Sequence, residues 1–305
     1  ANIVNNTDPR AQAIFNAHTH QVYAWDAPTG QRPIVQAGSY ASNIGKVTLS
    51  VDPATGETCS YTKSVEPMST TPVATLVTTY PRAAQAKQIV TQALATAQVI
   101  GTQVVGTASA PVTRALTTNA NGSISDDRAR ESTLSNMVAD MFKDTIGATN
   151  PDVIGMQNPG GTRADLDAGP ITYAEAAAIL PFANSLFTTQ ITGAQLKTVL
   201  EQQWQRDAKG VVPSRPYLQL GLSKNVTYTF DASRPEGDRI TSISVNGAPA
   251  NTTKLYTVVS GSFLIAGGDN FHELAKGVNT ADAGRADLEA WVTWLKAQGT
   301  VAPSF

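Results

Sequence analysis

The stretch PRAAQAKQIVTQALATAQVIG, residues 81–101, divides the chain into two unequal parts. Most of its larger apolar residues and two of its alanines fall on one helical stripe, at Ile89, Val90, Ala93, Leu94, Ala97 and Ile100. Pro81 suits the first turn of a helix, and Gly101 suits its end. Because strand patterns occur on both sides of this segment, we interpret it as a connecting helix.

The part that precedes this helix is predicted to be β-structure. Arg32–Tyr40 carries a short apolar run, and Lys46–Val51 alternates between apolar and polar residues, as in a strand with one buried face. Asp52–Gly56 supplies a turn into a second strand around Thr58–Val65. We therefore expect a β-hairpin before residue 70.

The part that follows mixes helices and strands. Thr172 with Glu175, and Thr192 with Gln195, have the spacing of capping boxes that open helices. Further helices are expected at 131–147 and near the end of the chain, around Leu288–Leu295. Strands are predicted at Asp152–Met156, Leu186–Ile191, Val226–Phe230, Ile240–Val245 and Leu255–Ser260, with a hairpin turn at Asn246-Gly247. These patterns predict an α+β fold.

Composition narrows the classes of function. The 305 residues favour two domains, and 22 basic against 24 acidic residues give a net charge of −2, which provides no general attraction for nucleic acid. The single Cys59 excludes an intrachain disulfide framework. No run of 18 apolar residues predicts a transmembrane segment. Low charge and abundant Thr, Ala and Asn favour a secreted or cell-envelope bacterial protein.

The histidine pair His18 and His20 is a candidate for metal binding. We expect an extended segment there, which would place both imidazoles on one face. Catalytic zinc needs three protein ligands and an open position, and no further ligand is evident nearby. Spacing alone therefore leaves two interpretations, a solvated or hydrogen-bonded pair and a metal site completed by residues outside this chain.

Two glycine-rich loops are candidates for ligand binding. In Asn158–Arg163, adjacent Gly160 and Gly161 would let successive N–H groups face an anion, and Arg163 would add a bidentate contact. Gly267–Phe271 ends in an aromatic ring. For the glycines the alternative is an ordinary turn, and for the ring it is packing in the core.

Two further residues lie at element boundaries. Phe182 follows Pro181 where a helix should end, so its ring and that of Phe271 would stack on a planar ligand if both faced a cleft. Arg130 lies at the start of the predicted 131–147 helix, where an anion is also favoured. A solvated surface arginine is the alternative for Arg130. Neither a nucleophile elbow, nor a Walker A loop, nor a dinucleotide-binding glycine motif occurs in the sequence.

Taken together, these segments resemble the 5′-nucleotidase family of two-domain metallophosphoesterases. The matching segments of its substrate-binding domain are Arg130–Asn136, Asn158–Arg163, Gly169–Tyr173, Leu180–Asn184, Leu196-Lys197 and Gly267–Phe271. Phe15–His20 and Pro33–Tyr40 resemble the last segment of the family's metallophosphatase domain. The resemblance implies a metallophosphoesterase remnant of a four-layer domain at 1–72, a linker helix within 73–102 and a C-terminal substrate-binding domain of mixed α/β type at 103–305.

The resemblance also implies roles for individual residues. Substrate-binding positions would be Arg130, Asn158, Gly160, Gly161, Arg163 and Asp269, the arginines and Asn158 on the phosphate or sugar–phosphate side. Phe182 and Phe271 would sandwich the nucleobase. His18 matches a ligand of the family's two-metal centre, and His20 matches a position at that centre. Pro159 stands where the family usually has glycine, which fixes φ and removes one N–H.

The expected function is therefore nucleotide recognition within a secreted hydrolase that releases phosphate from nucleoside monophosphates. The complete enzyme would use two divalent metal ions, Zn, Mn or similar. None of the family's catalytic residues lies in this chain, so we expect it to need the missing N-terminal metallophosphatase segment and to be inactive alone. The alternatives are a 2′,3′-cyclic phosphodiesterase/3′-nucleotidase, a nucleotide-sugar hydrolase, or a non-catalytic nucleoside-binding surface fragment.

Overall fold

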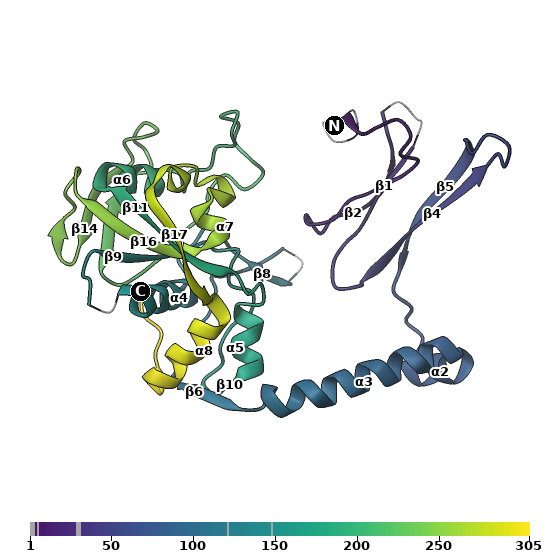
Figure 1. Cartoon of the computed structure of the whole chain (residues 1–305), viewed down its shortest axis with the longest axis horizontal. Helices are drawn as coiled ribbons and strands as arrows, with labels where there is room; N and C mark the ends of the chain where they lie inside the picture. Colours follow the sequence, from purple (N-terminus) through teal and green to yellow (C-terminus); the bar gives the residue numbers. More distant parts are fainter. Residues whose placement is uncertain (1–3, 5, 29–31, 121, 148) are drawn as a thin grey trace. The chain divides into compact units, whose positions relative to one another are not determined.

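A computed structural model describes residues 4, 6–28, 32–120, 122–147 and 149–305 and divides the chain into two compact units, Ala1–Thr91 and Gln92–Phe305. The division falls inside α3 (Pro81–Gly101), the helix predicted to connect two parts (Figure 1). All residues of α3 are described and none is buried, with Leu94 of the predicted stripe 64% exposed. The helix is present as predicted, and its apolar stripe is exposed to solvent among the described residues.

The first unit consists mainly of strands. A three-stranded sheet has the order β1-β3-β2, with β1 at Ile14–Phe15, β3 at Pro33–Ala37 and β2 at Val22–Asp26. The predicted hairpin is present as β4 (Asn43–Val51) and β5 (Thr58–Pro67), and α2 (Val73–Thr79) follows it. Tyr61 of the hairpin donates a hydrogen bond to Asp26 at 2.8 Å. This contact joins the hairpin to the end of β2.

The second unit is organised around a five-stranded sheet. Its order is β12 (Gly221–Leu222), β9 (Val153–Gln157), β16 (Leu255–Gly261), β11 (Ser185–Thr192) and β17 (Val278–Ala286). A second sheet contains β10 (Gly169–Thr172), β6 (Val104–Ala108) and β18 (Thr300–Val301). Two smaller sheets contain β13 (Val226–Phe230), β14 (Ile240–Val245) and β15 (Ala248–Pro249), and β7 (Leu116–Thr118) with β8 (Ile124–Asp126).

Helices cover both faces of the central sheet. They are α4 (Thr133–Gly147), α5 (Tyr173–Ile179), α6 (Gly193–Glu201), α7 (Ser262–Ile265) and α8 (Asp287–Gln298), with short 3₁₀ turns η1 (Gly268–Asn270) and η2 (Leu274–Lys276). Figure 1 shows α4 and α8 on one side of this sheet, and α6 and α7 on the other. The predicted α+β class is confirmed.

Alternate residues of the central strands face two separate hydrophobic cores. In β9, Val153 belongs to the first core and Ile154 to the second; in β16, Val259 belongs to the first and Val258 to the second. Because side chains alternate across a strand, one sheet can serve both cores. This double burial explains why the central strands have nearly continuous apolar sequences.

Sequence signals at the helix starts work as predicted. Thr172 accepts a hydrogen bond from the Glu175 backbone while Glu175 accepts one from the Thr172 backbone, and Thr192 and Gln195 do the same. Each capping box satisfies two backbone donors that the first turn would leave unpaired. None of the helices in the described part of the chain has the combination of length and apolar character that crossing a bilayer requires.

Gly155 of β9 provides a test of how closely α4 packs on the sheet. A Cβ added at Gly155 would lie 1.8 Å from the Ala139 carbonyl oxygen, which is backbone and has no rotamer to change. We expect Gly155→Ala to lower the free energy of unfolding by about 3 kcal/mol, measured by urea denaturation. The matched control is Gly101→Ala, whose added Cβ would meet only the Ala174 side chain, at an ordinary 3.4 Å. Equal stability of the two variants would contradict this close approach.

Candidate functional site

The predicted binding loops meet at one edge of the central sheet. Strands β9 and β16 run parallel, so the loop after β9 and the segment after β16 leave the sheet at the same edge. Strand β11 is antiparallel to β16 and pairs Leu186 with Gly261, which brings the segment before β11 to that edge as well. In open α/β sheets, ligands bind outside the carboxyl ends of parallel strands. Asn158–Arg163, Gly267–Phe271 and Phe182 therefore occupy the place where this topology favours a ligand.

The Asn158–Arg163 loop is a tight turn. Gly161 N donates to the Asn158 carbonyl oxygen at 2.9 Å, which places Pro159 at the second turn position, where its fixed φ is favourable. The Gly161 N–H is thus occupied, so the predicted row of free N–H groups facing an anion is not formed as expected. A Cβ added at Gly160 would lie 2.8 Å from Arg128 Nη1, the end of a flexible side chain. The guanidinium of Arg128 therefore packs against this turn.

A hydrogen bond joins the two glycine-rich loops. Asn158 Nδ2 donates to Asp269 Oδ2 at 2.8 Å, although the residues lie 111 positions apart. Asp269 has a left-handed backbone with φ of 51°, and Asn270 follows with φ of 62°. Asn270 Nδ2 donates to Gln205 Oε1 at 2.8 Å, which helps to hold this unusual conformation. Backbone strain of this kind concentrates at functional sites.

Arg163 and Phe182 are also brought together. The guanidinium carbon of Arg163 lies 5.9 Å from the centroid of the Phe182 ring, within range of a cation–π contact. The Phe182 ring is 56% exposed, and Arg163 Nη1 reaches the Gly160 carbonyl oxygen only at 3.5 Å. Among the described residues Arg163 has no ion pair, so its guanidinium retains donors for a ligand.

Phe271 does not occupy the predicted position. Its side chain is fully buried in the second core, so the expectation that it faces a cleft is wrong. The exposed ring of this segment is Phe263, which is 50% exposed. A Cβ added at Gly268 would lie 2.6 Å from ring atoms of Phe263, so the ring packs against the glycine loop. The sequence signal for Phe263 was its place two residues after Gly261, where β16 ends.

Arg130 also differs from expectation. Its side chain is 66% exposed, and Nη1 contacts the Leu116 carbonyl oxygen at 3.4 Å rather than the binding loops. Helix α4 starts at Thr133, with Ser132 Oγ accepting from Ser135 N, so Arg130 lies before the capping residue. Arg128, which sequence reasoning missed, is 19% exposed and pairs with Asp126 at 2.9 Å. The alternation Arg128-Ala129-Arg130 was the available signal.

The histidine pair lies in the first unit. His18 and His20 are exposed and have left-handed φ values of 70° and 57°, so the segment bends and is not extended as predicted. The side chain of buried Gln36 stabilises this bend. It accepts a hydrogen bond from Thr19 Oγ1 at 2.7 Å and donates one to the Ala17 carbonyl oxygen at 2.7 Å. In the described part of the chain, no three His, Cys, Asp or Glu side chains are grouped to hold a metal ion. Two imidazoles alone do not make a two-metal centre.

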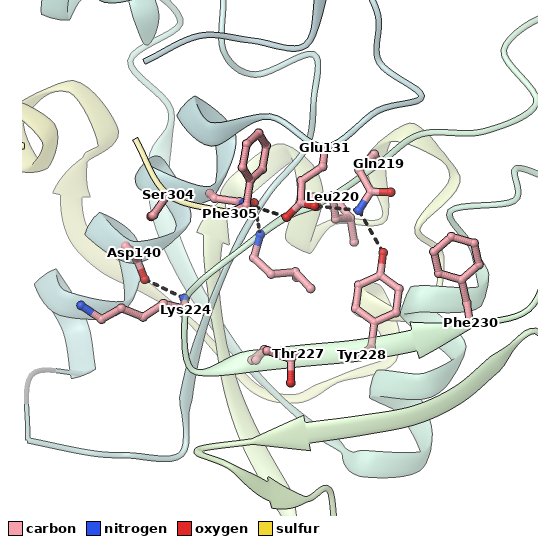
Figure 2. Close-up of a pocket in the computed structure, with 13 residues that line it drawn as sticks. Glu131, Asp140, Gln219, Leu220, Lys224, Thr227, Tyr228, Phe230, Ser304 and Phe305 are labelled. Carbon is pink, nitrogen blue, oxygen red and sulfur yellow. Dashed lines mark hydrogen bonds between the residues drawn. The ribbon is translucent and has the colours of Figure 1, made fainter. Parts of the chain in front are cut away.

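A separate pocket of about 450 Å³ lies near the start of α4 (Figure 2). Its lining includes Glu131, Gln219 and Tyr228, with Gln219 Nε2 donating to the Tyr228 hydroxyl at 2.9 Å. None of the predicted substrate-binding residues lines it. Gln219 N donates to the Arg128 carbonyl oxygen at 2.8 Å, so one wall of the pocket supports the backbone behind Arg128.

Comparison with known proteins gives a family match over the second unit. The sequence profile of the 5′-nucleotidase C-terminal domain matches residues 104–276. The trifunctional nucleotide phosphoesterase protein YfkN of Bacillus subtilis is 31% identical over 181 residues, which are 56% of this chain and 12% of that protein. The cell wall protein Lmo0130 of Listeria monocytogenes is 27% identical over 313 aligned positions, covering 96% of this chain and 36% of that protein.

Solved structures agree with the sequence comparison. The 5′-nucleotidase precursor of Thermus thermophilus is 25% identical, with a TM-score of 0.58, over 96% of this chain and 58% of that structure. The chain spans about a tenth of the length of the Bacillus relative and about a third of the length of the Listeria relative. The recognised family and its fold are confirmed by these matches.

The two phenylalanines near the glycine loop should differ in their effect on stability. We expect Phe271→Ala to lower the free energy of unfolding by about 3–5 kcal/mol, because it empties a fully packed core position. Phe263→Ala removes a half-exposed ring and should cost about 1 kcal/mol or less. Thermal melts followed by circular dichroism measure both. A larger loss for Phe263→Ala would contradict the burial described above.

Proposed function

Because the chain belongs to the 5′-nucleotidase family through its C-terminal domain, we propose that this domain recognises the nucleotide substrate of a phosphoester hydrolase. The observation that supports this most is the gathering at one sheet edge of an exposed ring, an arginine lying beside that ring, and the Asn158–Asp269 hydrogen bond. An aromatic surface, cations and a carboxylate acceptor match the base, phosphate and ribose hydroxyls of a nucleotide.

The nucleobase would stack between Phe182 and Phe263. Both rings are about half exposed. They belong to neighbouring segments, because a Cβ added at Gly261, two residues before Phe263, would lie 3.5 Å from the Cβ of Asn184, two residues after Phe182. The pair proposed here replaces the one expected from sequence, because the Phe271 ring is in the core. Stacking on aromatic rings suits any base, so this slot by itself does not select one.

The phosphate side of the nucleotide would face Arg163 and Arg128, which both lie next to Gly160 of the turn. Arginine presents several donors in a planar fork, which fits phosphate oxygens better than a single ammonium does. Asp269 is an acceptor for ribose hydroxyls, and Asn158 orients its carboxylate. In this proposal the base, sugar and phosphate would lie along the sheet edge.

Hydrolysis itself requires residues beyond those described here. We propose that the complete enzyme holds divalent metal ions, which supply an activated water and neutralise the developing phosphate charge, with His18 and His20 at that centre. His18 and His20 are held on a bend by Gln36, but the described residues provide no complete donor set. The chain alone would therefore bind nucleotide without turning it over, and a metallophosphatase segment that supplies the other metal ligands would be its partner.

Two finer assignments follow from the named relatives. The Bacillus relative is called a trifunctional nucleotide phosphoesterase, so more than one phosphoester activity is compatible with this domain, and the 2′,3′-cyclic phosphodiesterase/3′-nucleotidase activity suggested by the sequence resemblance stays the second candidate. The Listeria relative is called a cell wall protein, which supports our proposal that this protein is exported to the cell envelope or medium.

Base stacking is tested by adenosine binding in isothermal titration calorimetry. We expect Phe182→Ala and Phe263→Ala each to weaken binding by about 1–3 kcal/mol, because each removes one stacking face. Phe230→Ala is the control, since its ring is also 50% exposed but belongs to β13. Unchanged affinity in both site variants would refute the stacking slot.

Phosphate recognition is tested by comparing AMP with adenosine. Arg163→Ala and Arg128→Ala should each weaken AMP binding by about 1–3 kcal/mol, the range for a hydrogen-bonded charged group, and adenosine binding much less. Arg206→Ala, whose partner is Glu236 at 2.7 Å, is the matched control. Equal losses for the two ligands would assign both site arginines a structural role only.

A further inference from the structure

The segment that carries Phe182 is attached to the start of α8. Asn184 Nδ2 donates to Asp287 Oδ2 at 3.2 Å, and Asp287 N donates to the Asn184 carbonyl oxygen at 2.9 Å. These two bonds join residues that lie 103 positions apart. Asp287 Oδ1 accepts from Leu288 N at 2.7 Å, so the carboxylate is shared between the helix start and Asn184.

A buried carboxylate at this position needs an explanation. Asp287 is 3% exposed, and no cation pairs with it among the described residues. Burial raises the pKa of Asp287, and hydrogen bonds from Asn184 and Leu288 partly offset this rise. Asp287 is the first residue of α8 and follows the N-cap Ala286, and accepting the Leu288 N–H needs only one of its carboxylate oxygens. The additional acceptor that an aspartate offers is the one that binds Asn184.

The two hydrogen bonds between Asn184 and Asp287 form a clamp. The segment between this clamp and the Phe182 ring has little conformational freedom. Ala183 is the single residue between Phe182 and Asn184, and its φ of 49° lies in the left-handed region that alanine rarely adopts. Such a conformation persists only where the neighbouring residues are held in place. Asn184 also borders Gly261, two residues before Phe263. The position of Asn184 therefore influences the segments that carry both exposed rings.

We propose that Asp287 is a positioning residue that, through Asn184, holds the Phe182 ring in place for the nucleobase. This inference rests on the function proposed above. It adds to the site a residue that lies beneath the loop and acts without contacting the ligand. Its effect should fall on the base, and should leave the phosphate contacts of Arg163 and Arg128 unchanged.

Exchange of the two side chains tests the clamp by calorimetric titration with adenosine and AMP. Asn184→Asp would set two carboxylates against each other, so adenosine affinity should fall about tenfold while the ratio of AMP to adenosine affinity stays constant. Adding Asp287→Asn should restore affinity to within about twofold, because the amide introduced at position 287 can donate to the carboxylate introduced at position 184 while its oxygen still accepts from Leu288 N. A double variant as weak as Asn184→Asp overturns the proposal.

A measurement without ligand separates the clamp from the proposed function. In protein labelled with 4-fluorophenylalanine, the Phe182 resonance, identified with Phe182→Leu, should broaden or shift in Asn184→Asp and return in the double variant. The buried Phe271 resonance should not change. A Phe182 resonance that is the same in all variants overturns the clamp. Failure of the wild type to bind adenosine would instead overturn the function, while the fluorine spectra still decide the clamp.

Two further variants provide an uncharged test of the clamp and a control. Asn184→Ala removes the side-chain hydrogen bond to Asp287 without adding a charge. We expect it to weaken adenosine binding about threefold. This variant takes the place of Asn184→Asp if Asn184→Asp does not fold. Asn119→Ala is the control, because this exposed side chain bonds Ser123 in the turn between β7 and β8. Adenosine affinity and the Phe182 resonance should both be unchanged in Asn119→Ala. An Asn184→Ala protein with wild-type affinity and spectrum would overturn the clamp.

Discussion

The parallel pairing of β9 with β16 is the constraint on which the site depends. It aligns the carboxyl ends of two strands that are a hundred residues apart, so that the turn after β9 and the segment after β16 face each other. The hydrogen bond from Asn158 to Asp269 is a consequence of that alignment. The close contact of α4 with Gly155 keeps β9 in place, because the missing side chain lets the helix backbone approach the strand.

Local signals in the sequence were sufficient for most of the fold. Both capping boxes, the Asn246-Gly247 turn and the alternating hairpin form where they were predicted, because each depends on a few neighbouring residues. The family resemblance named loops that the structure brings to one edge of the central sheet. Asn158 contacts Asp269 and Arg163 contacts Phe182, and the binding roles that the resemblance implies for them stay predictions.

What the sequence could not decide was which side chain of a loop faces outward. Phe263 and Phe271 lie eight positions apart around one glycine loop, and only the packing of the second core shows that the latter is buried. The same holds for Arg128, which pairs with Asp126 and packs near Gly160, and for Arg130, which contacts the Leu116 carbonyl oxygen. The bend at His18 and His20 likewise depends on a buried side chain, Gln36, from a different strand.

Pro159 has a consequence for the thermodynamics of recognition. Its ring restricts the turn already in the unfolded chain, and the Gly161–Asn158 hydrogen bond closes the turn before any ligand arrives. A loop that is preorganised in this way loses little conformational entropy when it meets an anion. Proline at this position thus favours rigidity over adaptability, so this turn would tolerate fewer ligand shapes than a more mobile glycine loop.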